Sequence, residues 1–309
     1  MAVDRDRSIA LEHDGRLLYF CSRGCRDEFL GNGSLHEGRR AVELVRRVLD
    51  EPTLLQPVFQ PIVSLETGRV VGYEALARFA PIPLQLPEAW FDLAARAGLT
   101  PELEGLAVRR ALEVASRRPP PEGAFVSVNL SPLLLGDGRV ASALTAPRIE
   151  SHQVVLELTE RDRVADYDSL RAAIGPYRAR GFRIAVDDAG AGYASMRHIT
   201  ELRPDFIKLD ARLIAGLTDD QARQALVRAM ATFVGEIGGM LVAEGVEALA
   251  DLGLLTRIGR GILVQGNALA RPGPAWPAVA GTAIEPNRLE QTAAGVARPR
   301  AAVGAGQGR

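Results

Sequence analysis

Acidic side chains at widely separated points of the chain are the residues best suited to chemistry. Each follows a short apolar run, and together with one amide they are Glu74, Asn129, Glu157, Asp187, Asp188 and Glu244. Carboxylate and amide oxygens are the ligands that hard divalent ions such as Mg²⁺ and Mn²⁺ prefer. Five carboxylates that converge without a cation would repel one another and raise one another's pKa values. We therefore expect these residues to hold a divalent metal.

The adjacent pair Asp187 and Asp188 is the most informative part of this set. One carboxylate of such a pair can bridge two metal ions while its neighbour holds the second. Two ions about 3.5 to 4 Å apart are the usual arrangement for in-line displacement at phosphorus, because they activate water and neutralise charge on the phosphoryl oxygens. The pair therefore predicts hydrolysis of a phosphodiester.

Eight apolar runs position these side chains, and each run ends on a charged residue or an amide. The runs end near Gln60, Glu74, Asn129, Glu157, Asp187, Lys208, Glu244 and Gln265. Short apolar runs with polar breaks are typical of strands buried on both faces, and most intervals between them are long enough for a helix. This alternation predicts an α/β fold with a parallel sheet closed into a (β/α)8 TIM-like barrel, in which the carboxyl ends of the strands share one rim.

Length and composition agree with one large barrel. The chain has 309 residues, 47% of them hydrophobic, and a formal net charge of -1. A barrel of this kind takes about 250 residues. The charge gives no global attraction to a nucleic-acid polymer or an anionic membrane, and no apolar run of about 18 residues or signal-peptide pattern is visible. We expect a cytoplasmic protein without a disulfide framework, because Cys21 and Cys25 are its only cysteines.

Four segments are expected along the chain. Residues 1–30 form a small unit, residues 31–39 read as a Gly-rich linker, and residues 40–277 carry the barrel pattern. Residues 278–309 are rich in Ala, Gly, Pro and Arg, and we predict that this tail is disordered. Within the barrel, Thr100 and Pro101 are a helix cap and a first helical position, so we expect two helices to meet there.

The ordered motifs resemble the EAL domain family of cyclic di-GMP phosphodiesterases over roughly residues 40–275. The matching motifs are QPIV at 60–63, EALAR at 74–78, VNLSP at 128–132, ELTE at 157–160, DDAGAGYAS at 187–195, KLD at 208–210, EGVE at 244–247 and QG at 265–266. The resemblance implies a modified TIM barrel that hydrolyses cyclic di-GMP to linear pGpG with Mg²⁺ or Mn²⁺. It also implies a homodimer formed through the barrel.

The resemblance assigns a role to each site residue. Glu74, Asn129, Glu157 and Asp187 would hold the first metal ion, and Asp187, Asp188 and Glu244 would surround the second. Lys208 would hydrogen-bond the attacking water or a phosphate oxygen, and Glu160 would anchor the loop that begins with the Asp pair. Glu244 is the usual candidate for the general base, but two metal ions can lower the pKa of water sufficiently by themselves, so the proton acceptor stays open. Positions that contact substrate are matched by Gln60, Arg78, Asp210, Gln265 and Glu247.

Each of these residues also has an ordinary structural interpretation. Taken alone, Asp188, Glu160 and Glu247 would be solvated carboxylates or helix caps, and Arg78 would be a surface residue. Lys208 is different, because a lysine inside the apolar run FIKLD needs an anionic partner. The four histidines show no spacing typical of metal ligands, and we expect surface or loop positions for all of them: His13, His36, His152 and His198.

Three residues depart from the family pattern. Ala189 and Ala191 replace an aromatic and a hydroxyl residue in the loop after the Asp pair, and Asn267 replaces an aromatic after QG. We expect reduced order in this loop or altered regulation before outright loss of metal. The altered loop keeps open the alternative of an EAL-like receptor that binds cyclic di-GMP, cuts it weakly or not at all, and signals through a protein partner.

The N-terminal segment YFCSRGCRDEFL resembles the second half of a YHS or TRASH-type metal-binding module. On a helix, Cys21 and Cys25 face the same way, so both sulfurs can reach one soft ion such as Zn²⁺. The upstream cysteine of that module is missing, and a closed zinc site needs four ligands. A remnant with two reduced thiols is an equally good interpretation, and a heavy-metal-responsive regulator is a third function that rests on these cysteines alone.

Overall fold

The computed structural model describes residues 9–13, 16–20, 42–79, 87–145, 149–159, 166–190, 194–259 and 261–279. The chain divides into two compact units. The smaller comprises described residues within 1–54 and 79–104, and the larger comprises those within 55–78 and 105–309.

The smaller unit contains a two-stranded antiparallel hairpin and helices. Its strands are β1 (Ile9–His13) and β2 (Arg16–Phe20). Residues 42–50 are helical and are followed by a short 3-10 turn, η2 (Pro52–Leu54). Helix α2 (Pro87–Ala97) ends before α3 (Thr100–Arg117) begins, so the predicted division between two helices at Thr100 is confirmed.

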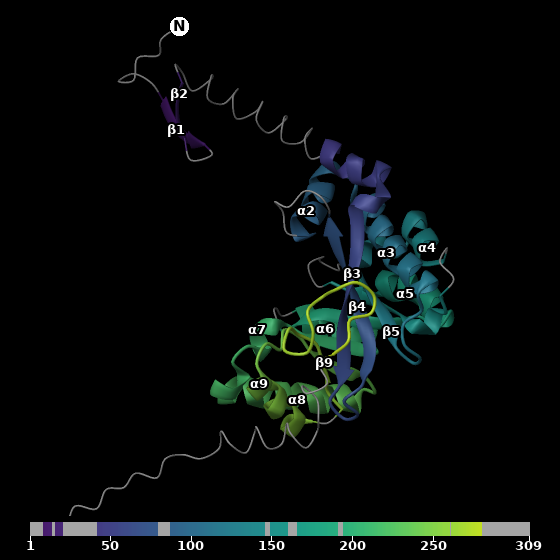
Figure 1. Ribbon diagram of the computed structural model, residues 1–309, viewed down its shortest axis with the longest axis vertical. Helices are drawn as coiled ribbons and strands as arrows, with labels where there is room; N and C mark the ends of the chain where they lie inside the picture. Colours follow the sequence, from purple (N-terminus) through teal and green to yellow (C-terminus); the bar gives the residue numbers. More distant parts are fainter. Residues whose placement is uncertain are drawn as a thin grey trace, which may run out of the picture. The chain divides into compact units, whose positions relative to one another are not determined.

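The larger unit is built on a closed eight-stranded barrel with the strand order β10-β3-β4-β5-β6-β7-β8-β9. Figure 1 labels β3, β4, β5 and β9 of this barrel. The strands are β3 (Leu55–Ser64), β4 (Val70–Phe79), β5 (Phe125–Leu130), β6 (Val154–Leu158), β7 (Arg183–Ala189), β8 (Phe206–Leu209), β9 (Met240–Ala243) and β10 (Leu263–Val264). The predicted barrel is therefore confirmed, and each apolar run of the sequence forms one of its strands.

One strand contradicts the expectation of a uniformly parallel sheet. Strands β4 to β10 run parallel wherever their pairing is defined, whereas β3 is antiparallel to β10, with Leu263 opposite Ser64. Only residues 65–69 connect β3 to β4, which is too short for the crossover helix that parallel strands require. Gln60 consequently lies in the middle of a reversed strand rather than at a carboxyl end.

Helices and short turns occupy the other connections. They are α4 (Gly138–Thr145), α5 (Tyr167–Ala179), α6 (Ala194–Leu202), α7 (Ala211–Ile214), α8 (Gln221–Glu236), α9 (Leu249–Ile258), and the 3-10 turns η3 (Pro132–Leu134), η4 (Ser151–Gln153) and η5 (Leu217–Asp219). None of the helices in the described ranges has the length and apolar character needed to span a bilayer.

The barrel interior is apolar at one level and polar at the next. Its apolar layer contains Ile62, Phe125, Val155, Ala185, Phe206, Val242 and Leu263. Phe125 and Phe206 belong to strands that are not neighbours in the sheet, yet their ring centroids lie 4.9 Å apart, so they meet across the interior. Because side chains alternate along a strand, the next inward position lies two residues further on. In β6 and β8 that position is Glu157 and Lys208.

Candidate functional site

Lys208 lies at the centre of the polar layer. Its ammonium group approaches four carboxylates, with Nζ 2.6 Å from Glu244 Oε1, 2.7 Å from Glu157 Oε2, 3.3 Å from Asp187 Oδ1 and 3.4 Å from Glu74 Oε2. The lysine is 2% exposed and is the only lysine in the sequence. The prediction that it requires an anionic partner is confirmed, and it has four.

Positive charge is scarce in this layer. Burial, together with repulsion from Glu74 and Asp187, raises the pKa of Glu157 well above its usual value. Burial likewise raises the pKa of Glu244 to about 8, against the opposing effect of Lys208. Burial alone would lower the pKa of Lys208, but the surrounding carboxylates raise it well above its ordinary value. These shifts favour the charged form of Lys208 and the neutral forms of Glu157 and Glu244.

A hydrogen-bond network orients Glu74 from both sides. Asn129 Nδ2 donates to Glu74 Oε1 at 3.0 Å, and Gln265 Nε2 donates to Glu74 Oε2 at 2.6 Å. The same Gln265 nitrogen reaches Gln60 Oε1 at 3.0 Å, and Gln60 Nε2 donates to the carbonyl of Ala270 at 3.2 Å. Burial raises the pKa of Glu74, but the charge of Lys208 and the hydrogen bonds from Gln265 and Asn129 hold it below its usual value.

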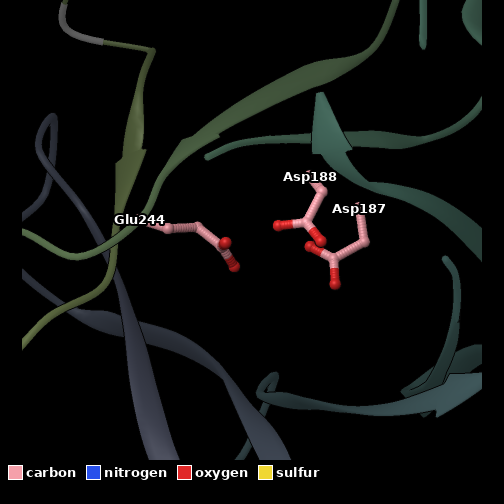
Figure 2. A group of neighbouring side chains, drawn as sticks. All are labelled: Asp187, Asp188 and Glu244. Atoms are coloured by element: carbon pink, nitrogen blue, oxygen red, sulfur yellow. The ribbon is translucent and has the colours of Figure 1, made fainter. Parts of the chain in front are cut away.

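The Asp pair owes its geometry to an irregular backbone. Neighbouring residues of a regular strand point to opposite faces, so Asp188 would face away from Asp187. The pairing of β7 with β8 shifts register between Val186 and Ala189, and Asp188 has a φ of 54°. A bulge of this kind re-aims a side chain. Figure 2 shows Asp187, Asp188 and Glu244 pointing toward one another, and carboxylate oxygens of the three lie within 4.8 Å of each other.

The donors in this cluster fit a divalent cation. All are hard oxygen ligands, and three carboxylates converge on one point beside a single lysine. Asp187 Oδ1 is buried and accepts no hydrogen bond from the described residues, so Lys208 at 3.3 Å is its nearest charge partner. Burial raises the pKa of Glu244, and a bound cation would favour the ionised form of this carboxyl.

Other predicted residues lie in different surroundings. Arg78 is half-buried, and its Nη1 donates to the neighbouring carbonyl of Ala77 at 2.8 Å. Glu247 is exposed on the loop after β9. Asp210 lies beyond the carboxyl end of β8, where it caps α7 and pairs with Arg212, a residue that the motif comparison did not single out. The remaining predicted residues lie outside the described ranges: Glu160, Cys21 and Cys25.

The expectation for His198 is wrong. His152 is exposed as predicted, but His198 is 2% exposed on α6, and its Nδ1 lies 2.9 Å from the hydroxyl of Tyr167. Its position on a helix face that packs inward is set by tertiary contacts. His13 ends β1, and His36 is not among the described residues.

The structure describes two of the three residues that depart from the family pattern, Ala189 and Asn267. Ala189 is fully buried at the end of β7, so it belongs to the core and is not part of an open loop. Gly190 follows with a φ of 102°, a conformation that favours glycine. Asn267 is exposed, whereas Ala191 lies outside the described residues. The expectation about loop order therefore stays a prediction.

Proteins of known sequence are similar to most of this chain. It is 30% identical over 259 residues to the bifunctional diguanylate cyclase/cyclic di-GMP phosphodiesterase MucR of Pseudomonas aeruginosa, which covers 81% of this chain and 36% of that protein. It is 26% identical over 262 residues to the probable cyclic di-GMP phosphodiesterase PdeG of Escherichia coli, covering 79% of this chain and 49% of that protein. The chain spans between about a quarter and a half of the length of such relatives.

A solved structure leads to the same family. The phosphodiesterase unit of PaMucR, in complex with c-di-GMP, superposes with a TM-score of 0.67 at 28% identity, covering 76% of this chain and 98% of that one. The family model of the EAL domain matches residues 44–272, a range that begins after the cysteine pair and so gives no support to a YHS or TRASH-type module. That range contains the whole barrel and every residue of its polar layer, and the chain belongs to the EAL domain family.

Proposed function

We propose that this chain hydrolyses cyclic di-GMP to linear pGpG with the help of two Mg²⁺ or Mn²⁺ ions. The observation that carries the proposal is the cation-poor cluster of carboxylates around Lys208 inside an EAL-family barrel. Relatives named as cyclic di-GMP phosphodiesterases and a related structure bound to c-di-GMP support the choice of substrate.

The residues divide into two groups by their exposure. The side chains of Glu157 and Glu74 are 1% and 9% exposed, which suits groups that hold a metal ion from the buried side of the site. Those of Asp187 and Glu244 are 14% and 17% exposed, so they can reach both an ion and an incoming ligand. We assign Asn129 and Asp188 to the same set of ligands, because Asn129 contacts Glu74 and Asp188 converges with Asp187.

In the proposed reaction, the oxygen of a water attacks phosphorus, one P–O3′ bond breaks, and the departing 3′ oxygen takes up a proton. Bound Mg²⁺ or Mn²⁺ would lower the pKa of that water and neutralise charge on the phosphoryl oxygens. We assign Glu244 as the acceptor of the water's proton, because its side chain is the most exposed of the four carboxylates around Lys208. Lys208 fixes the orientation of these carboxylates, and Gln60 and Gln265 fix that of Glu74.

The proposal assigns the reaction to the segment 40–277, with residues 278–309 as a tail outside the catalytic unit. Arg78, Glu247 and Glu160 keep the predicted roles near substrate and in the loop after the Asp pair, and Asp210 acts near substrate through Arg212, with which it pairs. A homodimer and a cytoplasmic location remain predictions. The N-terminal cysteines form a separate hypothesis, tested by titrating a soft metal against the wild type and a Cys21→Ser variant.

Incubation of the purified protein with cyclic di-GMP and Mn²⁺, Mg²⁺ or EDTA tests the proposal. We expect pGpG to appear only with metal and to be lost in Glu74→Ala. Glu122→Ala is the matched control, because Glu122 is exposed and precedes β5, and its activity should equal that of the wild type. Tight binding of cyclic di-GMP without turnover under all metal conditions would favour the receptor instead.

A further inference from the structure

Asp210 and Arg212 form a closely matched pair just beyond β8. Arg212 directs three nitrogens at this carboxylate: its backbone N is 2.7 Å and its Nε 3.0 Å from Oδ1, and its Nη2 is 2.8 Å from Oδ2. Nε also lies 3.2 Å from Oδ2. Asp210 is 8% exposed, so little room remains for another donor. A ligand that bonded directly to Asp210 would have to displace Arg212.

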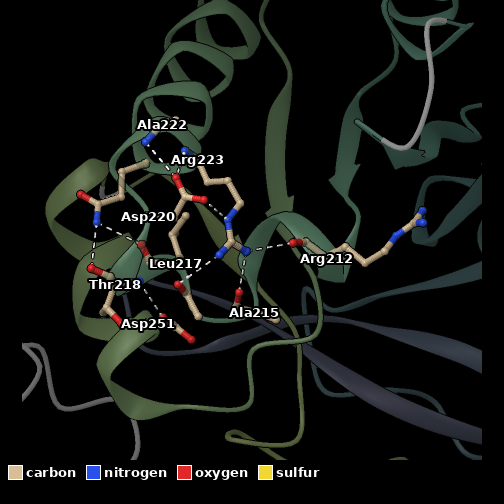
Figure 3. Close-up of polar contacts among 10 residues, drawn as sticks. Arg212, Ala215, Leu217, Thr218, Asp220, Ala222, Arg223 and Asp251 are labelled. Carbon is tan, nitrogen blue, oxygen red and sulfur yellow. Dashed lines mark hydrogen bonds and ion pairs between the residues drawn. The ribbon is translucent and has the colours of Figure 1, made fainter.

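The segment from α7, which carries Arg212, to η5 is held by side chains from α8 and α9 (Figure 3). Arg223 donates to the carbonyls of Arg212 at 3.1 Å and Ala215 at 2.6 Å, while its Nε bonds Asp220 Oδ2 at 2.9 Å. Asp251 is buried and accepts from the backbone N of Thr218 at 3.2 Å. The backbone of Arg212 is therefore fixed independently of its side chain, which extends away from Arg223 in Figure 3.

The guanidinium of Arg212 is an accessible cation beyond the carboxyl end of β8. Its side chain is 78% exposed, whereas that of Lys208 is 2% exposed and enclosed by carboxylates. The backbone N of Asp210 donates to the carbonyl of Ala189, the residue after Asp188, so the pair lies beside the strand end that carries the metal-ligand cluster. The hydrogen bonds and charge of Asp210 raise the pKa of Arg212. With Nε and one hydrogen of Nη2 directed at Asp210, the outer edge formed by Nη1 and Nη2 still offers two parallel N–H donors.

The net charge of the pair decides which acceptor it fits. Arg212 and Asp210 together are neutral, so the pair offers directed hydrogen bonds and little net attraction for a second phosphate. Guanine presents O6 and N7 as adjacent acceptors that match two parallel N–H groups of arginine. We propose that Arg212 recognises the O6 and N7 edge of one guanine of the substrate and that Asp210 is the residue that positions it. This inference rests on the proposed function and names a specificity-determining residue for it.

The test compares four proteins on two substrates. The proteins are the wild type, Arg212→Ala, Arg212→Lys and Arg139→Ala, and the substrates are cyclic di-GMP and its analogue with carbon in place of N7 in both guanines. Arg139 is a matched control because it pairs with Asp137 through the same three nitrogens, at 2.8, 2.9 and 2.7 Å, at the start of α4. Formation of pGpG, or of its analogue, gives kcat and KM for each combination.

We expect Arg212→Ala to raise the KM for cyclic di-GMP about ten- to a hundredfold with a much smaller change in kcat, as loss of a bidentate base contact predicts. Arg212→Lys should behave similarly, because lysine keeps the charge and lacks the planar fork. The analogue should have a KM about fivefold or more above that of cyclic di-GMP in the wild type and in Arg139→Ala, but not in Arg212→Ala. A double variant that combines Asp210→Ala with Arg212→Ala should have nearly the same KM for cyclic di-GMP as Arg212→Ala alone.

Three results would overturn the inference while leaving the proposed function intact. The first is an Arg212→Ala enzyme with the KM of the wild type. The second is an Arg212→Lys enzyme that keeps the wild-type KM. The third is an analogue whose KM exceeds that of cyclic di-GMP by the same factor with and without Arg212. The second result would indicate a contact with phosphate through charge alone. Failure of the wild type to form pGpG with either metal is a different outcome, because it would remove the proposed function and this inference with it.

Discussion

Replacement of Lys208 by methionine should destabilise the metal-free protein strongly. The variant keeps a side chain of similar length but removes the one positive charge that contacts Glu74, Glu157, Asp187 and Glu244. These carboxylates then face one another with no cation among them. The expected response is partial protonation of the cluster and a lower free energy of unfolding.

The distances set the size of the effect. Nζ lies 2.6 to 3.4 Å from the four carboxylate oxygens, so each contact contributes about 5 to 6 kcal/mol of gross attraction at an effective dielectric constant of about 20. Desolvation of a fully buried ammonium cancels much of this sum. Removal of one partner from a buried ionic cluster costs about 3 to 5 kcal/mol net. For a barrel of this size, that loss corresponds to a fall in Tm of about 6 to 20 °C.

Thermal unfolding in EDTA and in Mn²⁺ measures this loss and its cause. We expect the full decrease in Tm in EDTA and a smaller one in Mn²⁺, because a bound cation supplies positive charge to the same carboxylates. Arg171→Met is the matched control: Arg171 pairs with Asp168 and Glu201, but its side chain is 44% exposed. Exposed pairs contribute about 0 to 1 kcal/mol, so this control should unfold close to the wild type. A Lys208→Met protein as stable as Arg171→Met in EDTA would refute the reasoning.

Four further variants at three positions test the backbone and the packing of the barrel by thermal and urea unfolding. Gly266→Ala should cost about 3 kcal/mol, because its Cβ would lie 2.2 Å from the carbonyl oxygen of Val246, and a soluble variant of wild-type stability would show that this contact can relax. Tyr177→Phe should cost about 1 kcal/mol, since the buried hydroxyl donates to the carbonyl of Leu135 at 2.7 Å, and an unchanged urea midpoint would contradict this. Asp188→Asn should be more stable than Asp188→Ala by about 1 kcal/mol, because asparagine tolerates a φ of 54° better than alanine does, and equal stabilities would refute the role of backbone strain.

Much of the site could be predicted from the sequence because strands alternate with a period of two. Val155 of the apolar layer is followed two positions later by Glu157, Phe206 by Lys208, and Val242 by Glu244. Ala185 and Asp187 show the same relation, as do Leu263 and Gln265. A polar residue at an inward position near a strand end can therefore be identified from the sequence alone.

In the reversed strand β3, the polar residue comes two positions before the apolar one instead of two positions after it. Gln60 precedes Ile62 of the apolar layer by two residues, which brings it to the polar level although β3 runs against its neighbours. The antiparallel direction of β3 could have been inferred from residues 65–69, because this connection to β4 is too short for a crossover helix. By contrast, the burial of His198 depends on which face of α6 packs inward, and the pairing of Asp210 with Arg212 depends on a loop conformation. Neither leaves a periodic signal.

Asp188 does not follow the alternation of side chains along β7, and the bulge that causes this connects the metal-ligand cluster with the Asp210–Arg212 pair. It lies out of phase with Asp187, so its convergence with Asp187 and Glu244 depends on the bulge of β7 and on its positive φ. The bulge ends at Ala189, which is fully buried, is paired with Leu209 and accepts a hydrogen bond from the backbone N of Asp210 at 3.3 Å. The backbone that re-aims one carboxylate is thereby joined to the residue that positions Arg212. A large side chain at position 189 would disturb both together, so the alanine at this position preserves the geometry of the metal-ligand cluster as well as that of the proposed guanine contact.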